Sequence, residues 1–468
     1  MGKQTKFKLT KGYIKMTKEE LLQKKVSAIN LGCDKNRVDL EHMLFALKEY
    51  GFEIVADISE AEIIIVNTCA FIKPAIIEAV ENINLAIEQK MLGRAEKIIV
   101  SGCFPQRNLS VLEENFKEVD LFLLFKDNDK ICSKIEELYN VQNTSFCADL
   151  TGRVLTNAGK FAYLKIADGC SNGCAYCTLP RIRGRFTSVP QKQLIKEAKN
   201  LVAKGYKELI LVAQDTARYG EDLNLENGLL NLLKELVKIK GLEWIRLQYI
   251  YPEWLTDDLL QYIKTEPKMC KYLDMPLQHI DDEILKAMNR KTGEEKSREL
   301  VKKIKNEYPE ITLRSTFIVG LPGETKQKFK KLCDFIAEGN IDYATFFSYF
   351  REENTKAYFM KKQVKEFVKK RRLKKIEEIQ NLVLNEINLK KLGQIESVLI
   401  DDFDEFENIF IAHSQNNSPN VDLSVIINAE NHSDLKIGEI YKVKLTKLIN
   451  NGFEGEVIKN DTQSSYDD

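Results

Sequence analysis

Hydrophobic positions in the first third of the chain alternate between two patterns. Short runs rich in β-branched residues predict strands at residues 26–30, 62–66, 97–101 and 120–124. Between them, hydrophobic residues recur at helical spacing and predict helices over 38–50 and 74–90. Strands and helices that alternate in this way favour right-handed crossovers between parallel strands. We therefore expect an α/β fold, with a doubly wound parallel sheet in an N-terminal domain at residues 24–140.

The same alternation continues on a larger scale in the middle of the chain. Strands are predicted at residues 161–167, 208–213, 244–249, 272–275, 312–319 and 343–349. Helical patterns lie between them, and a long charged helix is expected over residues 361–392, with Gly393 as its cap. Repeated βα units of this kind suit a full or partial TIM-like barrel, whose chemistry lies at the carboxyl ends of the strands. We assign residues 156–392 to this central domain.

The last part of the chain changes character. Short β-patterned runs at residues 397–400, 423–427, 440–445 and 453–458 alternate with polar turns. This pattern predicts a small all-β barrel over residues 393–460.

Charge is balanced over the whole chain but not along it. The 468 residues include 70 Lys plus Arg and 70 Asp plus Glu, so the formal net charge is zero and gives no reason to expect a general nucleic-acid binder. Residues 394–468 contain 15 acidic residues and 5 Lys, a net of −10, which leaves +10 on the rest. The sequence shows neither a secretory signal nor a membrane-spanning run, so we expect a cytoplasmic protein.

Three of the ten cysteines form a C-x3-C-x2-C run directly after the predicted strand at 161–167: Cys170, Cys174 and Cys177. Disulfides are not expected in a reducing compartment, whereas thiolates are the soft ligands that hold iron and sulfide. The loop therefore predicts three catalytic ligands of a cluster whose fourth iron stays open. A zinc site and incidental cysteines are the alternatives that the loop alone leaves open.

Three further cysteines each follow a predicted strand of the N-terminal domain: Cys33, Cys69 and Cys103, at intervals of 36 and 34 residues. Because parallel strands end at one edge of a sheet, we expect these loops to converge on a second three-cysteine site. Three unrelated small core residues are the alternative. The other cysteines show no such arrangement and are expected to be structural thiols: Cys132, Cys147, Cys270 and Cys333.

A Gly-Leu-Pro-Gly turn follows the predicted strand at 312–319. Gly320 and Gly323 would let the backbone approach a ligand, and Glu324 lies where a helix begins; a plain βα turn is the alternative. Together with the C-x3-C-x2-C loop, this turn resembles the radical S-adenosylmethionine superfamily. The resemblance implies S-adenosylmethionine bound at the open iron and cleaved to a 5′-deoxyadenosyl radical. The candidate cofactor contacts are Tyr176, Gln214, Thr316, Ile318, Gly320, Gly323 and Glu324.

Two three-cysteine sites in one chain resemble the methylthiotransferase family. The resemblance covers nearly the whole chain and implies a methylthiotransferase N-terminal domain, a radical barrel and a C-terminal TRAM barrel. It also implies two 4Fe-4S clusters, S-adenosylmethionine as both methyl donor and radical source, and a reductant such as flavodoxin or ferredoxin. The net product would be a methylthio group on an unactivated carbon.

Several motifs resemble the RimO-type branch of that family, which modifies the β-carbon of an aspartate in small-subunit ribosomal protein S-twelve. These motifs lie at residues 30–36, 212–216, 249–252, 272–279 and 314–320. The acidic C-terminal barrel would attract a basic ribosomal protein and repel phosphate, which disfavours tRNA. The alternatives are a tRNA adenosine methylthiotransferase and a non-enzymatic cluster-binding scaffold.

A few residues differ from those usual in the RimO-type branch, and the roles of a few others have two possible interpretations. Asp34 stands where proline is usual, and Ala412 and His413 stand where the branch usually shows Gly-Arg, which leaves the docking of the C-terminal barrel open. His279 is equally a packing residue or a catalytic one. Arginines after the cluster loop are candidates for steering an anionic aspartate, with surface solubility as the alternative: Arg181, Arg183 and Arg185.

Overall fold

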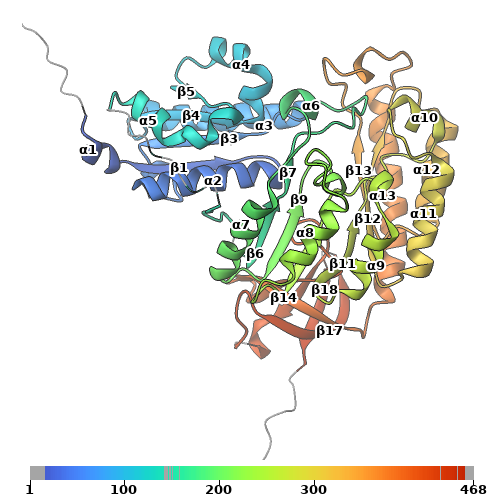
Figure 1. The fold of residues 1–468 in the computed structure, drawn as a ribbon. Helices are drawn as coiled ribbons and strands as arrows, with labels where there is room; N and C mark the ends of the chain where they lie inside the picture. Colours follow the sequence, from blue (N-terminus) through green and yellow to red (C-terminus); the bar gives the residue numbers. More distant parts are fainter. Residues whose placement is uncertain are drawn as a thin grey trace, which may run out of the picture. The chain divides into compact units, whose positions relative to one another are not determined.

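The computed structural model describes residues 16–141, 146, 149, 151–157, 159–432, 434–450 and 452–458. It contains two compact units (Figure 1): Met1–Ala70 with Pro74–Val154, and Phe71–Lys73 with Leu155–Asp468. We call them unit 1 and unit 2. Cys147, expected to be a structural thiol, lies outside the described residues.

Unit 1 is built on a five-stranded sheet in the order β2-β1-β3-β4-β5, and every strand pair is parallel. The strands are β1 (Lys25–Asn30), β2 (Glu53–Ile54), β3 (Ile63–Thr68), β4 (Lys97–Gly102) and β5 (Leu121–Phe122). The helices are α1 (Lys18–Leu22), α2 (Asp34–Tyr50), α3 (Lys73–Met91), α4 (Cys103–Asn115) and α5 (Ile131–Leu138). All six residues of β3 are buried, as expected for a central strand with both faces covered. The predicted doubly wound parallel sheet is therefore confirmed.

Unit 2 contains a six-stranded parallel sheet in the order β13-β12-β11-β10-β9-β6, with β13 and β6 at its edges. Its strands are β6 (Phe161–Lys165), β9 (Glu208–Val212), β10 (Trp244–Leu247), β11 (Met269–Asp274), β12 (Thr312–Val319) and β13 (Tyr343–Ser348). Helices cover the outer face of this sheet (Figure 1). The sheet is a partial version of the predicted TIM-like barrel, and its carboxyl edge is where chemistry is expected.

The remaining elements of this part of unit 2 are mostly crossover helices. They are α6 (Leu179–Ile182), α7 (Gln191–Ala203), α8 (Gly228–Leu236), α9 (Asp257–Thr265), α10 (Asp282–Ala287), α11 (Glu294–Glu307), α12 (Lys326–Ala337) and α13 (Glu366–Leu389). A short antiparallel pair is formed by β7 (Ala167–Asp168) and β8 (Thr187–Ser188). Short 3-10 helices occur in both units. Those of unit 1 are Ile58–Glu60 and Phe125–Lys130, and those of unit 2 are Thr216–Arg218, Pro252–Trp254, Ala357–Phe359 and Ala429–Asn431.

Five strands close into the predicted small barrel at the end of the chain. They are β14 (Ile395–Asp404), β15 (Ile409–Ser414), β16 (Ser424–Asn428), β17 (Ile440–Ile449) and β18 (Gly452–Val457). Neighbouring strands are antiparallel except β16 and β18, which are parallel. Val398, Ile427 and Val443 are fully buried in its core. Gly393 does not cap the preceding helix, which ends at Leu389, because its N–H donates to the Leu445 carbonyl oxygen of this barrel.

The loop between β15 and β16 attaches this C-terminal barrel to the central sheet. Arg246 donates to the Ser414 carbonyl oxygen at 2.9 Å, and Gln248 donates to the Ser418 hydroxyl at 2.8 Å. The Tyr272 hydroxyl donates to Asp422 at 2.6 Å. All these partners are buried, so the loop forms part of the interior of unit 2.

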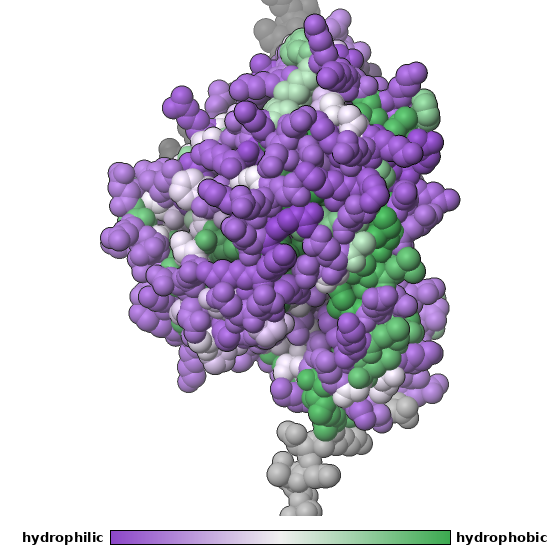
Figure 2. All heavy atoms as spheres, turned by 90° about the vertical axis from the view of Figure 1, so that its right-hand side faces the viewer, coloured by the Kyte–Doolittle hydropathy of each residue, from purple (hydrophilic) through white to green (hydrophobic). Residues whose placement is uncertain are grey.

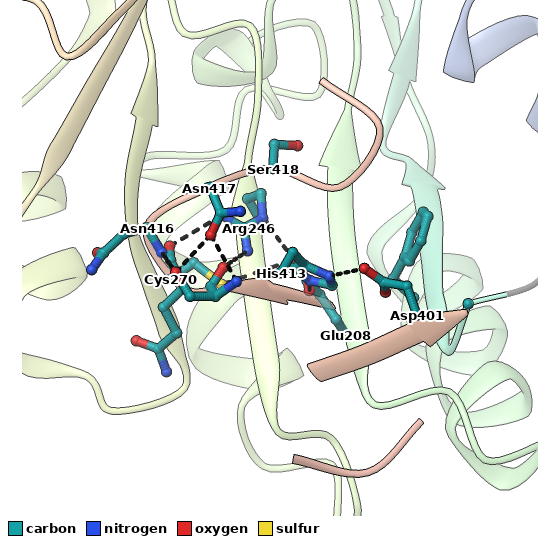
Figure 3. Close-up of polar contacts among 12 residues, drawn as sticks. Glu208, Arg246, Cys270, Asp401, His413, Asn416, Asn417 and Ser418 are labelled. Atoms are coloured by element: carbon teal, nitrogen blue, oxygen red, sulfur yellow. Dashed lines mark hydrogen bonds and ion pairs between the residues drawn. The ribbon is translucent and has the colours of Figure 1, made fainter. Parts of the chain in front are cut away.

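His413 lies at the centre of this attachment (Figure 3). Its Nδ1 lies 2.6 Å from Asp401, and its Nε2 contacts Glu208, which also pairs with Arg246 at 2.7 Å. Burial opposes a charge on His413, but Glu208 and Asp401 outweigh it and raise the His413 pKa to about 9. Burial raises the pKa of Asp401 even beside His413, whereas Arg246 and His413 outweigh burial at Glu208 and lower its pKa to about 2, so Glu208 is ionised beside the imidazolium. The docking of the C-terminal barrel, which the sequence left open, thus includes a charged His413 where the RimO-type branch usually has arginine.

The surface carrying α11 and α12 is mostly hydrophilic in Figure 2, in line with the many exposed charged residues of these helices. Within the described ranges, none of the helices combines the length and the apolar character that crossing a membrane requires.

Raising the pH should loosen the attachment of the C-terminal barrel. The pKa of His413 is raised from 6.5 to about 9, so its stabilisation is complete below about pH 6.5 and is lost as the pH rises through 9. Since one pKa unit corresponds to about 1.4 kcal/mol, the loss is at most about 3.5 kcal/mol. Thermal unfolding of the full chain across this pH range measures it.

The matched variants are His413→Gln, which removes the titrating group, and His432→Gln, which changes a second buried histidine of the same barrel. The first should lose most of the pH dependence and the second should keep it. An equal pH dependence in all three proteins would show that His413 does not control the attachment.

Candidate functional site

The C-x3-C-x2-C loop lies at the carboxyl edge of the central sheet, between β7 and α6. The N–H of Cys170 donates to the Gly184 carbonyl oxygen at 3.1 Å, which closes the loop onto the segment before β8. Gly169 has φ +73, and a Cβ on it would lie 2.1 Å from the Arg185 carbonyl oxygen. The tight path of the chain into the cluster loop therefore requires glycine at this position.

Polar groups surround the sulfur atoms of this loop. The Leu179 N–H donates to the Cys177 Sγ at 3.4 Å, and the Tyr251 hydroxyl lies 3.4 Å from the Cys174 Sγ. Burial raises the pKa of the Cys170 and Cys177 thiols, so metal binding would release protons from them. N–H and O–H groups aimed at sulfur suit thiolates that bind an iron–sulfur cluster.

Each cysteine of a 4Fe-4S cluster binds a different iron, so its ligands need not surround one point. In the ranges that the structure describes, no set of three or more His, Cys, Asp or Glu side chains is arranged around a single metal ion. The donor set of the loop, three thiols with sulfur-directed hydrogen bonds, fits the cluster predicted from the sequence.

A partly buried ionic cluster holds the start of the loop. Asp168 pairs with Arg183 at 2.8 Å and with Lys165 at 3.0 Å. Burial opposes ionisation of Asp168, but Lys165 and Arg183 outweigh it and hold its pKa well below the usual range. Gln214 donates to Asp168 at 3.3 Å. Arg183 and Gln214 thus position the cluster loop in this structure, whereas Arg181 and Arg185 are exposed.

Three of the predicted cofactor contacts line one cavity of about 250 Å³ at the same edge: Tyr176, Thr316 and Ile318. The cavity is also lined by Phe71, Ile72, Gln278, Phe347, Ser348, Tyr349, Phe350 and Glu352. Gln278 and the aromatic residues at the end of β13 were not among the predicted site residues, because no sequence motif marks them as ligand contacts. Gln278 has φ +71 and pairs with β12 through its N–H to the Thr316 carbonyl oxygen.

The Gly-Leu-Pro-Gly turn lies outside the lining of this cavity. Glu324 accepts from the Gly320 N–H at 2.9 Å and pairs with Arg372 at 2.6 Å, so its carboxylate stabilises the turn itself. His279 is buried, and its Nδ1 accepts from the Asp281 N–H at 3.0 Å. Its Nε2 lies 3.4 Å from the Glu324 carboxylate, so His279 packs against the residue that stabilises the turn.

Unit 1 brings its three predicted cysteines to one edge of its sheet. Cys33 precedes α2, Cys69 follows β3, and Cys103 is the first residue of α4. A Cβ on Gly32 would lie 2.7 Å from the Cys69 Cβ, and one on Gly102 would lie 2.4 Å from the Thr68 carbonyl oxygen. The three loops thus touch one another, because β1, β3 and β4 are neighbours in the sheet.

The other described cysteines lie apart from both sites. Cys132 is buried against the Ala46 carbonyl oxygen in unit 1, and Cys270 and Cys333 are buried in unit 2. Burial raises the pKa of Cys132 to about 12 and that of Cys333 to about 11, so both are inert thiols at neutral pH.

Three segments of the chain match known families. Residues 164–336 match the radical SAM superfamily, residues 25–123 match the uncharacterized protein family UPF0004, and residues 392–458 match the TRAM domain. Radical SAM membership implies a 4Fe-4S cluster and S-adenosylmethionine.

Whole-length relatives narrow the family further. A protein from Elusimicrobium minutum is 42% identical over 442 residues, which cover 93% of this chain and 100% of the relative. One from Geobacter sulfurreducens is 42% identical over 445 residues, with coverage of 93% and 99%. Both are named ribosomal protein uS12 methylthiotransferase RimO. The chain belongs to the RimO family of radical SAM methylthiotransferases.

A solved structure supports the fold alone. The radical S-adenosylmethionine methyltransferase TsrM from Kitasatospora setae has a TM-score of 0.52 and 15% identity, covering 71% of this chain and 77% of TsrM.

Membership of the RimO family confirms the enzyme class expected from the sequence, a radical SAM methylthiotransferase.

Two glycines of the turn after β12 offer a matched test. Both have positive φ, but a Cβ on Gly320 would lie 2.4 Å from the Cγ of buried Lys369, whereas a Cβ on Gly323 meets nothing within 4 Å. Gly320→Ala should therefore lower the free energy of unfolding by about 1 kcal/mol or more beyond Gly323→Ala. Chemical denaturation measures both, and equal losses would contradict the close packing of this turn on α13.

Proposed function

We propose that this chain transfers a methylthio group to the β-carbon of an aspartate in small-subunit ribosomal protein uS12, which is ribosomal protein S-twelve. The main support is similarity along nearly the whole chain to relatives that carry this name. The two three-cysteine arrangements, one at the sheet edge of each unit, support the same function.

We propose two 4Fe-4S clusters, one held by Cys170, Cys174 and Cys177 and the second by Cys33, Cys69 and Cys103. When bound, the first cluster and S-adenosylmethionine supply a carbon-centred radical that can remove a hydrogen atom from an unactivated carbon. Such chemistry is needed because the β-carbon of an aspartate carries no proton that a general base removes readily. The second cluster would handle the sulfur, with S-adenosylmethionine also as methyl donor.

The residues of the chain position and shield this chemistry. Tyr176, Thr316 and Ile318 line the cavity beside the cluster loop and would contact S-adenosylmethionine. The aromatic rings of Phe347 and Phe350 line the same cavity and would limit the entry of water. Gln214 would act through Asp168, and Gly320, Gly323 and Glu324 would shape the turn at the end of β12.

Charge on the C-terminal barrel favours a basic protein over tRNA. The tip of the β14–β15 hairpin exposes Asp402, Glu405 and Glu407 around Phe406, whose side chain is 100% exposed. Acidic groups attract the basic surface of a ribosomal protein and repel phosphate. A reductant such as flavodoxin or ferredoxin would supply the electron.

Mass spectrometry of ribosomal proteins and tRNA from cells that lack this chain tests the substrate. We expect uS12 to lose the mass of one methylthio group at an aspartate while tRNA adenosines keep their modification. Complementation with the wild-type gene should restore the mark, and complementation with Cys174→Ala should not. Loss of a mark on tRNA alone would overturn the proposal in favour of the tRNA alternative.

Iron content tests the two clusters. After anaerobic reconstitution, the wild-type chain should hold about eight irons, because each of two clusters contains four. Cys174→Ser and Cys69→Ser should each lower the content to about four, whereas Cys333→Ser changes a thiol apart from both sites and should leave it unchanged. An iron content of the wild-type chain below about five per chain would contradict the presence of two clusters. If the Cys174→Ser variant still cleaved S-adenosylmethionine, the C-x3-C-x2-C loop would not be needed for that reaction.

A further inference from the structure

Arg290 is a buried arginine that differs from the others in the chain. Four arginines are buried in the described ranges: Arg153, Arg246, Arg290 and Arg372. Three of them form ion pairs with a buried glutamate, namely Glu41, Glu208 and Glu324. Arg290 is 8% exposed and forms no ion pair with a carboxylate of the described chain. A guanidinium in such a place needs an anion close to it.

The contacts of Arg290 lead to the cluster loop. Its Nη1 lies 3.9 Å from the Cys174 Sγ, and its guanidinium stacks 4.2 Å from the centre of the Tyr251 ring. The Tyr251 hydroxyl lies 3.4 Å from the same sulfur atom. Nη2 donates to the Pro276 carbonyl oxygen at 2.5 Å, just beyond the end of β11. Two donors from different elements therefore meet at one cysteine sulfur.

Glu253 is a carboxylate whose charge acts on Arg290 and raises its pKa. One of its oxygens accepts from the backbone N–H groups of Lys291 and Thr292, at 3.2 Å and 3.1 Å. It therefore fixes the segment that follows Arg290 and does not pair with the guanidinium. The remaining anion at this place is the thiolate of Cys174 with the cluster that it would bind.

We propose that Arg290 is a positioning residue that sets the reduction potential of the cluster on Cys170, Cys174 and Cys177. Reduction adds one electron from a low-potential one-electron carrier and makes the cluster more negative. A fixed positive charge in a buried, low-dielectric place stabilises the reduced form, and a hydrogen bond to a ligand sulfur acts in the same direction. Arg290 thus makes the cluster easier to reduce, and Tyr251 assists through its hydroxyl.

This inference rests on the cluster of the proposed function. The measured quantity is the reduction potential of the cluster and not the rate of turnover. If Arg290 only held the cluster loop against Pro276, its replacement would lower stability without a systematic shift of that potential.

The test is a redox titration of the full-length, anaerobically reconstituted protein, followed by electron paramagnetic resonance. The signal of the loop cluster is assigned as the one that persists in a Cys33→Ser, Cys69→Ser and Cys103→Ser variant. Arg290→Gln and Arg290→Met should shift its midpoint potential to more negative values, Tyr251→Phe should shift it less, and Arg290→Lys should keep most of the wild-type value. Arg351→Gln is the control, since Arg351 also stacks on a tyrosine, Tyr358, but contacts no cysteine.

The outcomes separate the hypotheses. If the wild-type protein takes up no cluster at this loop, the proposed function fails. If it does, and Arg290→Gln or Arg290→Met holds a full cluster at an unchanged potential, only the role of Arg290 is overturned. If both neutral variants lose the cluster while Arg290→Lys keeps it, the requirement for the charge is supported. Loss of the cluster in all three, with a disturbed circular dichroism spectrum, would make Arg290 a structural residue and overturn the proposal.

Discussion

Neighbouring parallel strands end at one edge of a sheet, and both cysteine sites of this protein depend on that constraint. In unit 1, β1, β3 and β4 are adjacent, so cysteines 36 and 34 residues apart in sequence follow neighbouring strands. In unit 2, the cluster loop and the cavity beside it occupy the equivalent edge of the six-stranded sheet. The same backbone geometry thus places three cysteines at a sheet edge twice, once from three separate loops and once from a single loop.

The opposite end of the central sheet serves stability. There, Glu208, Arg246 and His413 form a buried charged cluster that joins the C-terminal barrel to the sheet. Buried charges are tolerated when each finds a partner, and removing one partner costs far more than the pair contributes. Arg290 lies near the cluster loop at the other end and has no carboxylate partner among the described residues. Under the proposed function, a bound anion satisfies the same rule there.

Local patterns in the sequence predicted most strands, the longer helices α2, α3 and α13, and the grouping of the two sets of three cysteines. They missed the two-residue strands β2 and β8 and the longer strand β15, and they began the long helix at 361 although α13 begins at Glu366. The cluster loop was predictable because its ligands lie within eight residues of one another. Arg290 was not, because it comes more than a hundred residues after Cys174 and no spacing rule connects them. Pairs such as Glu208 with His413, 205 residues apart, were hidden for the same reason.

Charge counted along the sequence also differs from charge presented to a partner. Residues 394–468 carry a net of −10, yet Asp401 contacts His413 and Asp422 contacts Tyr272 inside unit 2. These two carboxyl groups belong to the attachment of the barrel and not to its outer surface. The hairpin tip exposes acidic groups around Phe406, and further exposed acidic residues of the barrel are Glu430, Asp434, Glu439 and Glu456. A basic protein would therefore meet the exposed carboxylates of the barrel, and not the full net charge counted along its sequence.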